Sequence, residues 1–172
     1  MKRVWRLSML LLAASALAVL LPASNLENSP KVSLNVENAA PRQVEETTQK
    51  AVARDYAAAW QAMAEALEQN RTDLLGGNFI GTANDRLTAS IKAQLRTGLH
   101  QRIVDHGHNV EAVFYSPEGS AMELHDSARL ELQVLDGSNV VRSENVTVHF
   151  VALLTAAENS WKIRILEAVP SF

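Results

Sequence analysis

The chain has no cysteine among its 172 residues. It therefore has no disulfide, no thiolate metal ligand, no cysteine nucleophile and no cysteine to carry a lipid anchor. It also lacks a surplus of positive charge, because 16 basic residues stand against 19 acidic ones. Binding of nucleic acid depends on neutralising phosphates. This balance therefore disfavours nucleic acid and anionic lipid surfaces as partners.

Sequence motifs of common catalytic and cofactor sites are missing as well. Gly76-Gly77 lacks the Lys-Ser/Thr pair of a phosphate loop, and no Gly-x-Ser-x-Gly motif occurs. His106-Gly107-His108 comes nearest to a metal site, but it has no third ligand at a defined spacing. We interpret this pair as the end of a helix, where imidazoles suit the helix dipole. We expect neither a metal nor a cofactor.

The first 24 residues have the pattern of an export segment. Lys2, Arg3 and Arg6 precede an uncharged apolar run over residues 7–21. Positive charges hold the amino end of such a segment in the cytoplasm, and the apolar run directs the following chain across the membrane. We therefore predict that the rest of the chain lies outside the cytoplasm. That part has 13 basic and 19 acidic residues, a net charge near −6.

Two fates of this segment stay open. The run of fifteen residues reaches the upper limit of a signal-peptide core, whereas a spanning helix usually needs about 20. Cleavage after Ala23 or Ser24 would put Leu21 or Pro22 three residues back, and neither is small. Residues 1–24 are therefore either a single transmembrane anchor in the inner membrane or a signal peptide whose removal leaves a soluble periplasmic or otherwise extracytoplasmic domain.

Residues 25–42 have the composition of a flexible linker, rich in Asn, Ser, Glu and Pro, without a helical apolar period. We expect the folded domain over residues 43–172, which is long enough for one hydrophobic core. Its front half has helical periods. A long helix is predicted within residues 44–70, a very short one from Thr72 to Gly76, and a third from Asn84 to Gly107. The stripe of the first is Val52, Tyr56, Trp60, Met63 and Leu67, and that of the third is Leu87, Ile91, Leu95, Leu99 and Ile103.

After Gly107 the apolar period changes to two. We predict four strands over residues 109–115, 121–135, 140–155 and 161–169, separated by short turn-forming segments. Short separators between successive strands indicate an antiparallel meander. The fold class is thus α+β, with three helices on a curved four-stranded antiparallel sheet. The residues expected to face the helices are Leu130, Leu132, Val134, Val146, Val148, Phe150, Ala152, Leu154, Trp161, Ile163 and Ile165.

This order of elements, closed by the strand that holds Trp161-Lys162-Ile163, resembles the nuclear-transport-factor-2-like superfamily, a cystatin-like or SnoaL-like cone. The resemblance covers residues 43–172 and implies a cone of helices on a curved sheet. Some members of that superfamily are pocket enzymes, and others are interaction modules on a single membrane anchor. The layout of anchor and linker here is similar to the second kind. No catalytic residue of the family matches this chain position by position, so the resemblance assigns none.

Two carboxylates are the candidate catalytic residues. Pairing across the turn at residues 136–139 places Asp126 opposite Phe150, and the next hairpin, paired likewise, places Glu167 opposite Val148. Asp126 and Glu167 then share the apolar face, where burial raises the pKa of a carboxyl toward that of a general base. The alternative is that both are ordinary exposed carboxylates, Asp126 at a bulge and Glu167 near a fraying chain end.

Three aromatic residues are candidates for a ligand pocket: Tyr56 and Trp60 on the first helix, and Phe150 on the sheet. The alternative for them is plain core packing. A pocket of roughly 300 Å³ or more with converging polar groups would favour a small-molecule enzyme, whereas an interaction module fills its cone with side chains.

Together these patterns predict a non-catalytic extracytoplasmic binding or protein-interaction module, secreted or held on one N-terminal anchor. Its partner would be a protein or a small apolar ligand, and also the membrane if the N-terminal segment is uncleaved. A homodimer through the sheet is open as well. Two other functions remain as alternatives: a lyase or isomerase that uses an inward carboxylate, and a structural component of the envelope.

Overall fold

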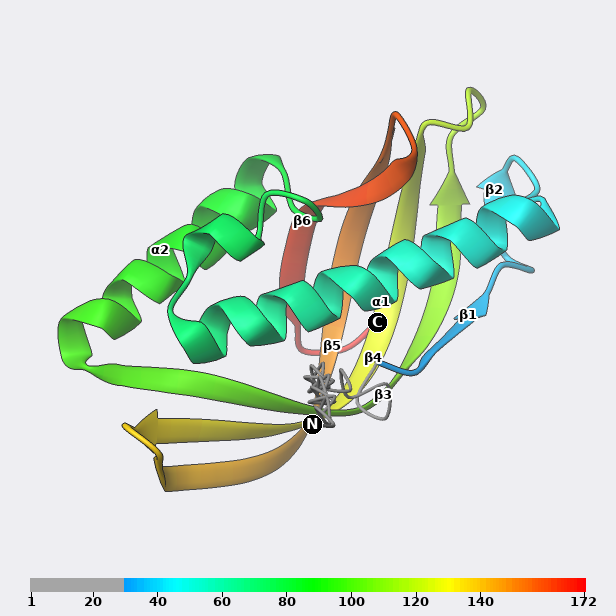
Figure 1. Ribbon diagram of the computed structural model, residues 1–172. Helices are drawn as coiled ribbons and strands as arrows, with labels where there is room; N and C mark the ends of the chain where they lie inside the picture. Colours follow the sequence, from blue (N-terminus) through cyan, green and yellow to red (C-terminus); the bar gives the residue numbers. More distant parts are fainter. Residues whose placement is uncertain (1–29) are drawn as a thin grey trace, which may run out of the picture.

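The computed structural model describes residues 30–172, so the apolar N-terminal segment and the question of its cleavage lie outside the described residues. Helices α1 (Glu46–Gln69) and α2 (Gly81–Thr97) lie on one face of a curved sheet (Figure 1). None of the helices in this part combines the length and apolar character needed to cross a membrane.

In the part of the chain that the structure describes, the sheet has six strands. β3 (Leu99–Tyr115), β4 (Ala121–Asp136), β5 (Asn139–Ala157) and β6 (Ser160–Val169) form an antiparallel meander, joined by short turns. β1 (Val32–Asn35) and β2 (Ala40–Pro41) pair in parallel with β3. The hydrophobic core lies between the helices and the facing side of this sheet.

The buried stripe predicted for the first helix is confirmed. Its five members, spaced by three or four residues, are all at most 5% exposed: Val52, Tyr56, Trp60, Met63 and Leu67. This spacing keeps them on one side of α1, so burial against the sheet stabilises the helix. α1 ends where Asn70 adopts a left-handed conformation with φ 53°.

The predicted fold class is wrong in its helix count. We expected three helices, but residues 30–172 contain two α-helices, with a single turn of 3-10 helix, η2 (Thr72–Leu74), between them. The helix predicted to continue to Gly107 ends at Thr97, because Gly98 takes a left-handed conformation with φ 72° and donates its amide to the carbonyl of Gln94. The chain then enters β3, so His106 and His108 lie in a strand rather than at a helix end.

The predicted four-stranded antiparallel sheet is also wrong, because β1 and β2 make the sheet six-stranded and mixed. Both strands come from residues 25–42, where we expected a flexible linker. In β1 the apolar residues Val32 and Leu34 alternate with Ser33 and Asn35, and both apolar side chains pack against the core. Four residues are too few for this alternation to stand out from a segment rich in Asn and Pro. Pairing with β3 supplies the hydrogen bonds that stabilise it.

The predicted register is confirmed in the first hairpin and wrong in the second. Asp126 pairs with Phe150, as expected from the turn at residues 136–139. Glu167 pairs with Val151 rather than with Val148. The second turn is tighter than we assumed, since Ala157 already pairs with Ser160, and a register shift follows between Leu153 and Leu154.

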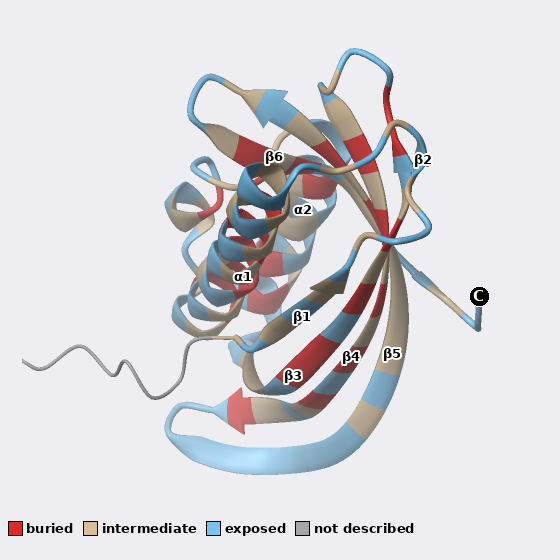
Figure 2. Cartoon of the chain, turned by 90° about the vertical axis from the view of Figure 1, so that its right-hand side faces the viewer, coloured by how far each residue is buried: buried red, intermediate tan, exposed pale blue. Residues whose placement is uncertain are grey.

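The face assignment fails at the far end of the first hairpin. Leu132 was expected inside but is 38% exposed. The hairpin of β4 and β5 extends past the helices that cover the rest of the sheet (Figures 1 and 2). Alternation along a strand predicts which side chains share a face, but only the packed helix makes that face an interior.

Candidate functional site

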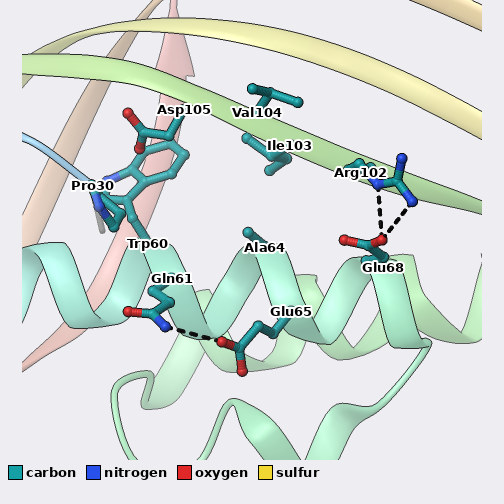
Figure 3. Close-up of a pocket in the computed structure, with 10 residues that line it drawn as sticks. All are labelled: Pro30, Trp60, Gln61, Ala64, Glu65, Glu68, Arg102, Ile103, Val104 and Asp105. Carbon is teal, nitrogen blue, oxygen red and sulfur yellow. Dashed lines mark hydrogen bonds and ion pairs between the residues drawn. The ribbon is translucent and has the colours of Figure 1, made fainter. Parts of the chain in front are cut away.

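A cleft of about 540 Å³ opens between α1 and β3 and is the main candidate for a binding site. We call it the α1–β3 cleft. Its lining residues are Pro30, Trp60, Gln61, Ala64, Glu65, Glu68, Arg102, Ile103, Val104 and Asp105. In Figure 3, Trp60 and Asp105 lie at one end, Arg102 and Glu68 lie at the other, and Ala64 faces Ile103 between them.

The polar wall of the cleft carries more negative than positive charge. Arg102 on β3 reaches across to Glu68 on α1, with 2.8 Å between guanidinium nitrogen and carboxylate oxygen. This pair links the two elements at one end of the cleft. Glu65 accepts a hydrogen bond from Gln61 at 3.1 Å, and its carboxylate charge has no basic partner among the described residues. Of the three carboxylates that line the cleft, Glu68 is thus paired with Arg102, and Asp105 lies 2.7 Å from the Nε2 atom of His108.

Behind Asp105, a chain of hydrogen bonds runs into the core, and we call it the His108 network. The Nε2 atom of His108 lies 2.7 Å from Oδ2 of Asp105, and its Nδ1 atom lies 2.7 Å from Oδ2 of Asp126. The hydroxyl of Tyr56 donates to the same Asp126 oxygen at 2.9 Å. Both ring nitrogens of His108 therefore face carboxylates, which favours an imidazolium that donates at each end.

A bulge in β3 makes this arrangement possible. In a regular strand, residues three apart point to opposite faces of the sheet. Between Asp105 and His108, β3 has one residue more than β4, and Gly107 adopts φ 120°, a conformation that favours glycine. The amide of Gly107 also donates to Oδ1 of Asp105 at 2.7 Å. The extra residue lets Asp105 and His108 meet on the same side.

The surroundings shift the pKa values of His108 and Tyr56. Burial by itself lowers the pKa of His108, but hydrogen bonds to Asp105 and Asp126, together with their negative charges, raise it to about 9. Burial and the charge of Asp126 raise the pKa of the Tyr56 hydroxyl well above its ordinary value. At neutral pH the network thus holds a charged imidazolium and a neutral phenol.

Aromatic rings enclose the imidazolium. The ring centroid of Trp60 lies 4.4 Å from that of His108, and Phe150 packs on Trp60 at 5.2 Å. A cation next to an indole is stabilised by the ring quadrupole. Two buried polar atoms of this cluster have no hydrogen-bond partner among the described residues: Nε1 of Trp60 and Oδ1 of Asp126.

The structure brings four of the five sequence candidates together. Tyr56 and Asp126 are hydrogen-bonded, Trp60 and Phe150 are in ring contact, and Asp126 is fully buried rather than exposed at a surface bulge. Glu167 is apart from them, as an exposed carboxylate paired with Arg86 at 2.9 Å. Trp60 alone of the five lines the cleft.

Sequence reasoning assigned no functional role to His108, Asp105, Arg102 or Glu68, although it considered His108 as part of a weak metal pair. We had extended the helical period through residue 103, which placed Arg102 and Asp105 in a helix and His108 just after it. We therefore did not expect partners for these residues across the cleft. The available signal was Gly98 directly after Arg96 and Thr97, a typical helix end with a basic last turn. In residues 30–172 the structure shows no group of three or more side chains suited to hold a metal ion.

The raised pKa of His108 predicts a loss of stability in mild alkali. Its folded-state pKa of about 9 exceeds the ordinary 6.5, so its contribution is fully present below about pH 6.5 and is lost as pH rises through 9. At ~1.4 kcal/mol per pKa unit, we expect a fall of about 3 kcal/mol in the free energy of unfolding. Urea titrations at pH 6, 7.5 and 9 measure it. The His108→Gln variant should lose this dependence, and an equal fall in that variant would contradict the assignment.

Comparison with known proteins adds information on the fold. No family model matches the chain, and no curated protein does. Among solved structures, the intermembrane space region of chloroplast protein ARC6 matches with 15% identity and a TM-score of 0.63, over 76% of this chain and 100% of that one. Aln2 from a Streptomyces species matches with 13% identity and a TM-score of 0.48, over 74% of this chain and 94% of that one. The first likeness shows that this chain and that region of ARC6 share a fold.

Proposed function

We propose that the domain is a non-catalytic extracytoplasmic binding module whose α1–β3 cleft takes a small ligand with an apolar body and a cationic group. The observation that carries this proposal is the open cleft of about 540 Å³ with its acidic wall. The basic residues before the N-terminal apolar run support a place outside the cytoplasm. The similar ARC6 domain is an intermembrane space region, which is in keeping with that place.

The volume of the cleft favours a binding site for a small molecule over an interaction module whose cone is filled by side chains. Binding sites for small molecules start at roughly 300 Å³ and combine apolar walls with a few polar groups. Here Ala64, Ile103 and Val104 supply apolar surface, while Glu65 and Glu68 supply negative charge. A ligand that places an ammonium or guanidinium group near these carboxylates would meet both requirements.

The state of the acid–base groups favours binding over catalysis. A general base needs a free lone pair within reach of its substrate. Both oxygens of Asp105 already accept hydrogen bonds, and both nitrogens of His108 face carboxylates. Asp126 is fully buried and does not line the cleft. The His108 network therefore supports the wall of the cleft, and Oδ1 of Asp126, which has no hydrogen-bond partner among the described residues, is buried away from a ligand in the cleft.

A matched pair of probes tests the charge preference. Octylammonium and octanoate share an apolar tail and differ in the sign of the head group. In a titration of residues 25–172 followed by amide NMR, octylammonium should shift the signals of Ala64, Glu68 and residues 102–105, and octanoate should bind more weakly. Because one exposed charge contributes about 0.2–1 kcal/mol, Glu65→Gln should weaken binding of the ammonium probe by a factor of about 1.4 to 5.

Two variants on α1 test the location of the site. Ala64→Phe fills the cleft, whereas Ala58→Phe places the same ring on an exposed position of the same helix. We expect the first to abolish the shifts and the second to leave them unchanged, with thermal unfolding confirming that both variants fold. Equal binding of octanoate, or unchanged binding by Ala64→Phe, would contradict the proposal.

A further inference from the structure

Within residues 30–172, the first half of β5 has one edge without a neighbouring strand. β4 covers one side of β5 along its whole length, but β6 pairs with the other side only from His149 onward. The backbone of residues 139–148 on that side has no strand partner among the described residues. Residues 139–145 are all exposed, and Figure 2 shows them as the pale blue lower part of β5. An unpaired strand edge of this kind is a template for another strand.

The chain end does not cover this edge. Continued straight on, the residues after β6 would lie beside residues 146–148 of β5. Instead, the ring of Phe172 stacks on His125 of β4 at 4.4 Å and contacts His149 at 5.1 Å. The tail therefore leaves the plane of the sheet and packs over its outer face, so it does not pair with this edge.

Apolar side chains accompany the open backbone. Val140 is 47% exposed, and Val141, the extra residue at a register shift against Val134 and Leu135, is 58% exposed. Leu132 on the neighbouring strand is exposed as well, on the opposite face of the hairpin from Val140, which pairs with Leu135. Burial of such surface adds to the backbone hydrogen bonds that a docked strand would form.

The charges on the edge match a second copy of the same strand. Arg142 and Glu144 lie two residues apart, so they share one face of β5, and they form an exposed ion pair at 2.8 Å. An antiparallel copy related by a two-fold axis at Ser143 places Arg142 opposite Glu144 of the second copy, and Glu144 opposite Arg142 of the second copy. Opposite charges directly across an antiparallel pair stabilise it. An axis at Glu144 would instead place the two Glu144 carboxylates against each other.

We propose that the chain forms a two-fold homodimer by antiparallel pairing of the β5 edges, with Ser143 on the axis. The two sheets then continue into one another, and the interface is isologous, since each edge is its own complement. The α1–β3 cleft is not part of the paired edges, so this inference stands independently of the proposed function.

Cross-linking through a single introduced cysteine tests the axis directly, because the chain has no cysteine of its own. On the axis, residue 143 faces its own copy at a Cα separation of about 4.5–5.5 Å, within the range of a disulfide. The control Thr147→Cys lies on the same strand and face. Four residues from the axis at ~3.4 Å each, the two copies of residue 147 would be about 27 Å apart.

In the full chain, held in micelles that outnumber the protein, we expect Ser143→Cys to form a covalent dimer on mild oxidation, while Thr147→Cys stays monomeric. Equal thermal transitions of the reduced proteins would show that both fold. A monomeric Ser143→Cys, or cross-linking of Thr147→Cys at the same rate, would overturn the proposal. The second result would indicate association through another surface or through random collision.

Charge reversal tests the pairing without a cross-link. Arg142→Glu turns two attractive contacts into repulsive ones and should raise the dimer dissociation constant about tenfold in sedimentation experiments. Adding Glu144→Arg restores opposite charges across the axis and should recover the dissociation constant to within about threefold. Lys92→Glu on α2 makes the same change in net charge away from β5 and should have no effect. The proposal fails if the unaltered chain shows no dimer, if the double variant does not recover, or if Lys92→Glu weakens the dimer equally.

Discussion

Asp126→Ala is expected to lower the free energy of unfolding by about 3–5 kcal/mol, because it removes one partner from a buried charged cluster. His108 would keep its positive charge at 3% exposure with only Asp105 left to balance it, and the hydroxyl of Tyr56 would lose its acceptor. Urea denaturation at pH 7 measures this cost.

Asp136→Ala is the matched control, since Asp136 is an exposed carboxylate at the turn end of the same strand. It should change stability by less than about 0.5 kcal/mol. If Asp126 were the exposed bulge residue of our alternative interpretation, the two variants would behave alike. A cost below about 1 kcal/mol for Asp126→Ala would therefore contradict the buried network.

Removal of residues 25–42 is expected to have an effect of similar size. A chain that begins at Gln43 lacks β1 and β2, and with them four partly buried apolar side chains that pack on the core: Val32, Leu34, Val36 and Ala39. At roughly 1 kcal/mol for each half-buried side chain, the loss is about 4 kcal/mol. It also leaves the amide of His108 without the carbonyl of Lys31, which accepts it at 2.9 Å.

Chains that begin at residues 25 and 43 can be compared by thermal unfolding and by solubility. We expect the longer chain to unfold cooperatively and the shorter one to be insoluble or to melt at a clearly lower temperature. Equal melting temperatures of the two chains would show that residues 25–42 do not stabilise the domain, despite their pairing with β3, and act as the linker that their composition indicates.

The sequence predicted well where one local pattern was long enough to exclude alternatives. Five apolar residues over more than four turns identified α1 and its buried face, because no strand period fits that spacing. The turn around Gly137 set the register of the first hairpin, and the pairing of Asp126 with Phe150 followed from it. In that hairpin, register depends on turn length and alternation, which are both local properties.

The sequence predicted the structure poorly where one or two residues change the direction of the chain. Leu99 and Ile103 fit a helical stripe, but Gly98 had already ended the helix, so a strand was taken for a helix. The same error hid the bulge at Gly107 and with it the meeting of Asp105 and His108. The register predicted for the second hairpin was wrong because the turn is shorter than the run of turn-forming residues at 156–160.

The sequence by itself therefore determined the amphipathic first helix, the antiparallel order of the last four strands and the absence of cysteine chemistry, since each depends on composition or on a local period. Only the tertiary structure decided the charge state of His108, the burial of Asp126 and the existence of the α1–β3 cleft. The pKa of His108 depends on its burial beneath α1 and on two carboxylates. One belongs to Asp105, three positions away on the same strand, and the other to Asp126, 18 positions away on β4. These contacts depend on how α1 lies on the curved sheet, and no period in the sequence encodes that arrangement.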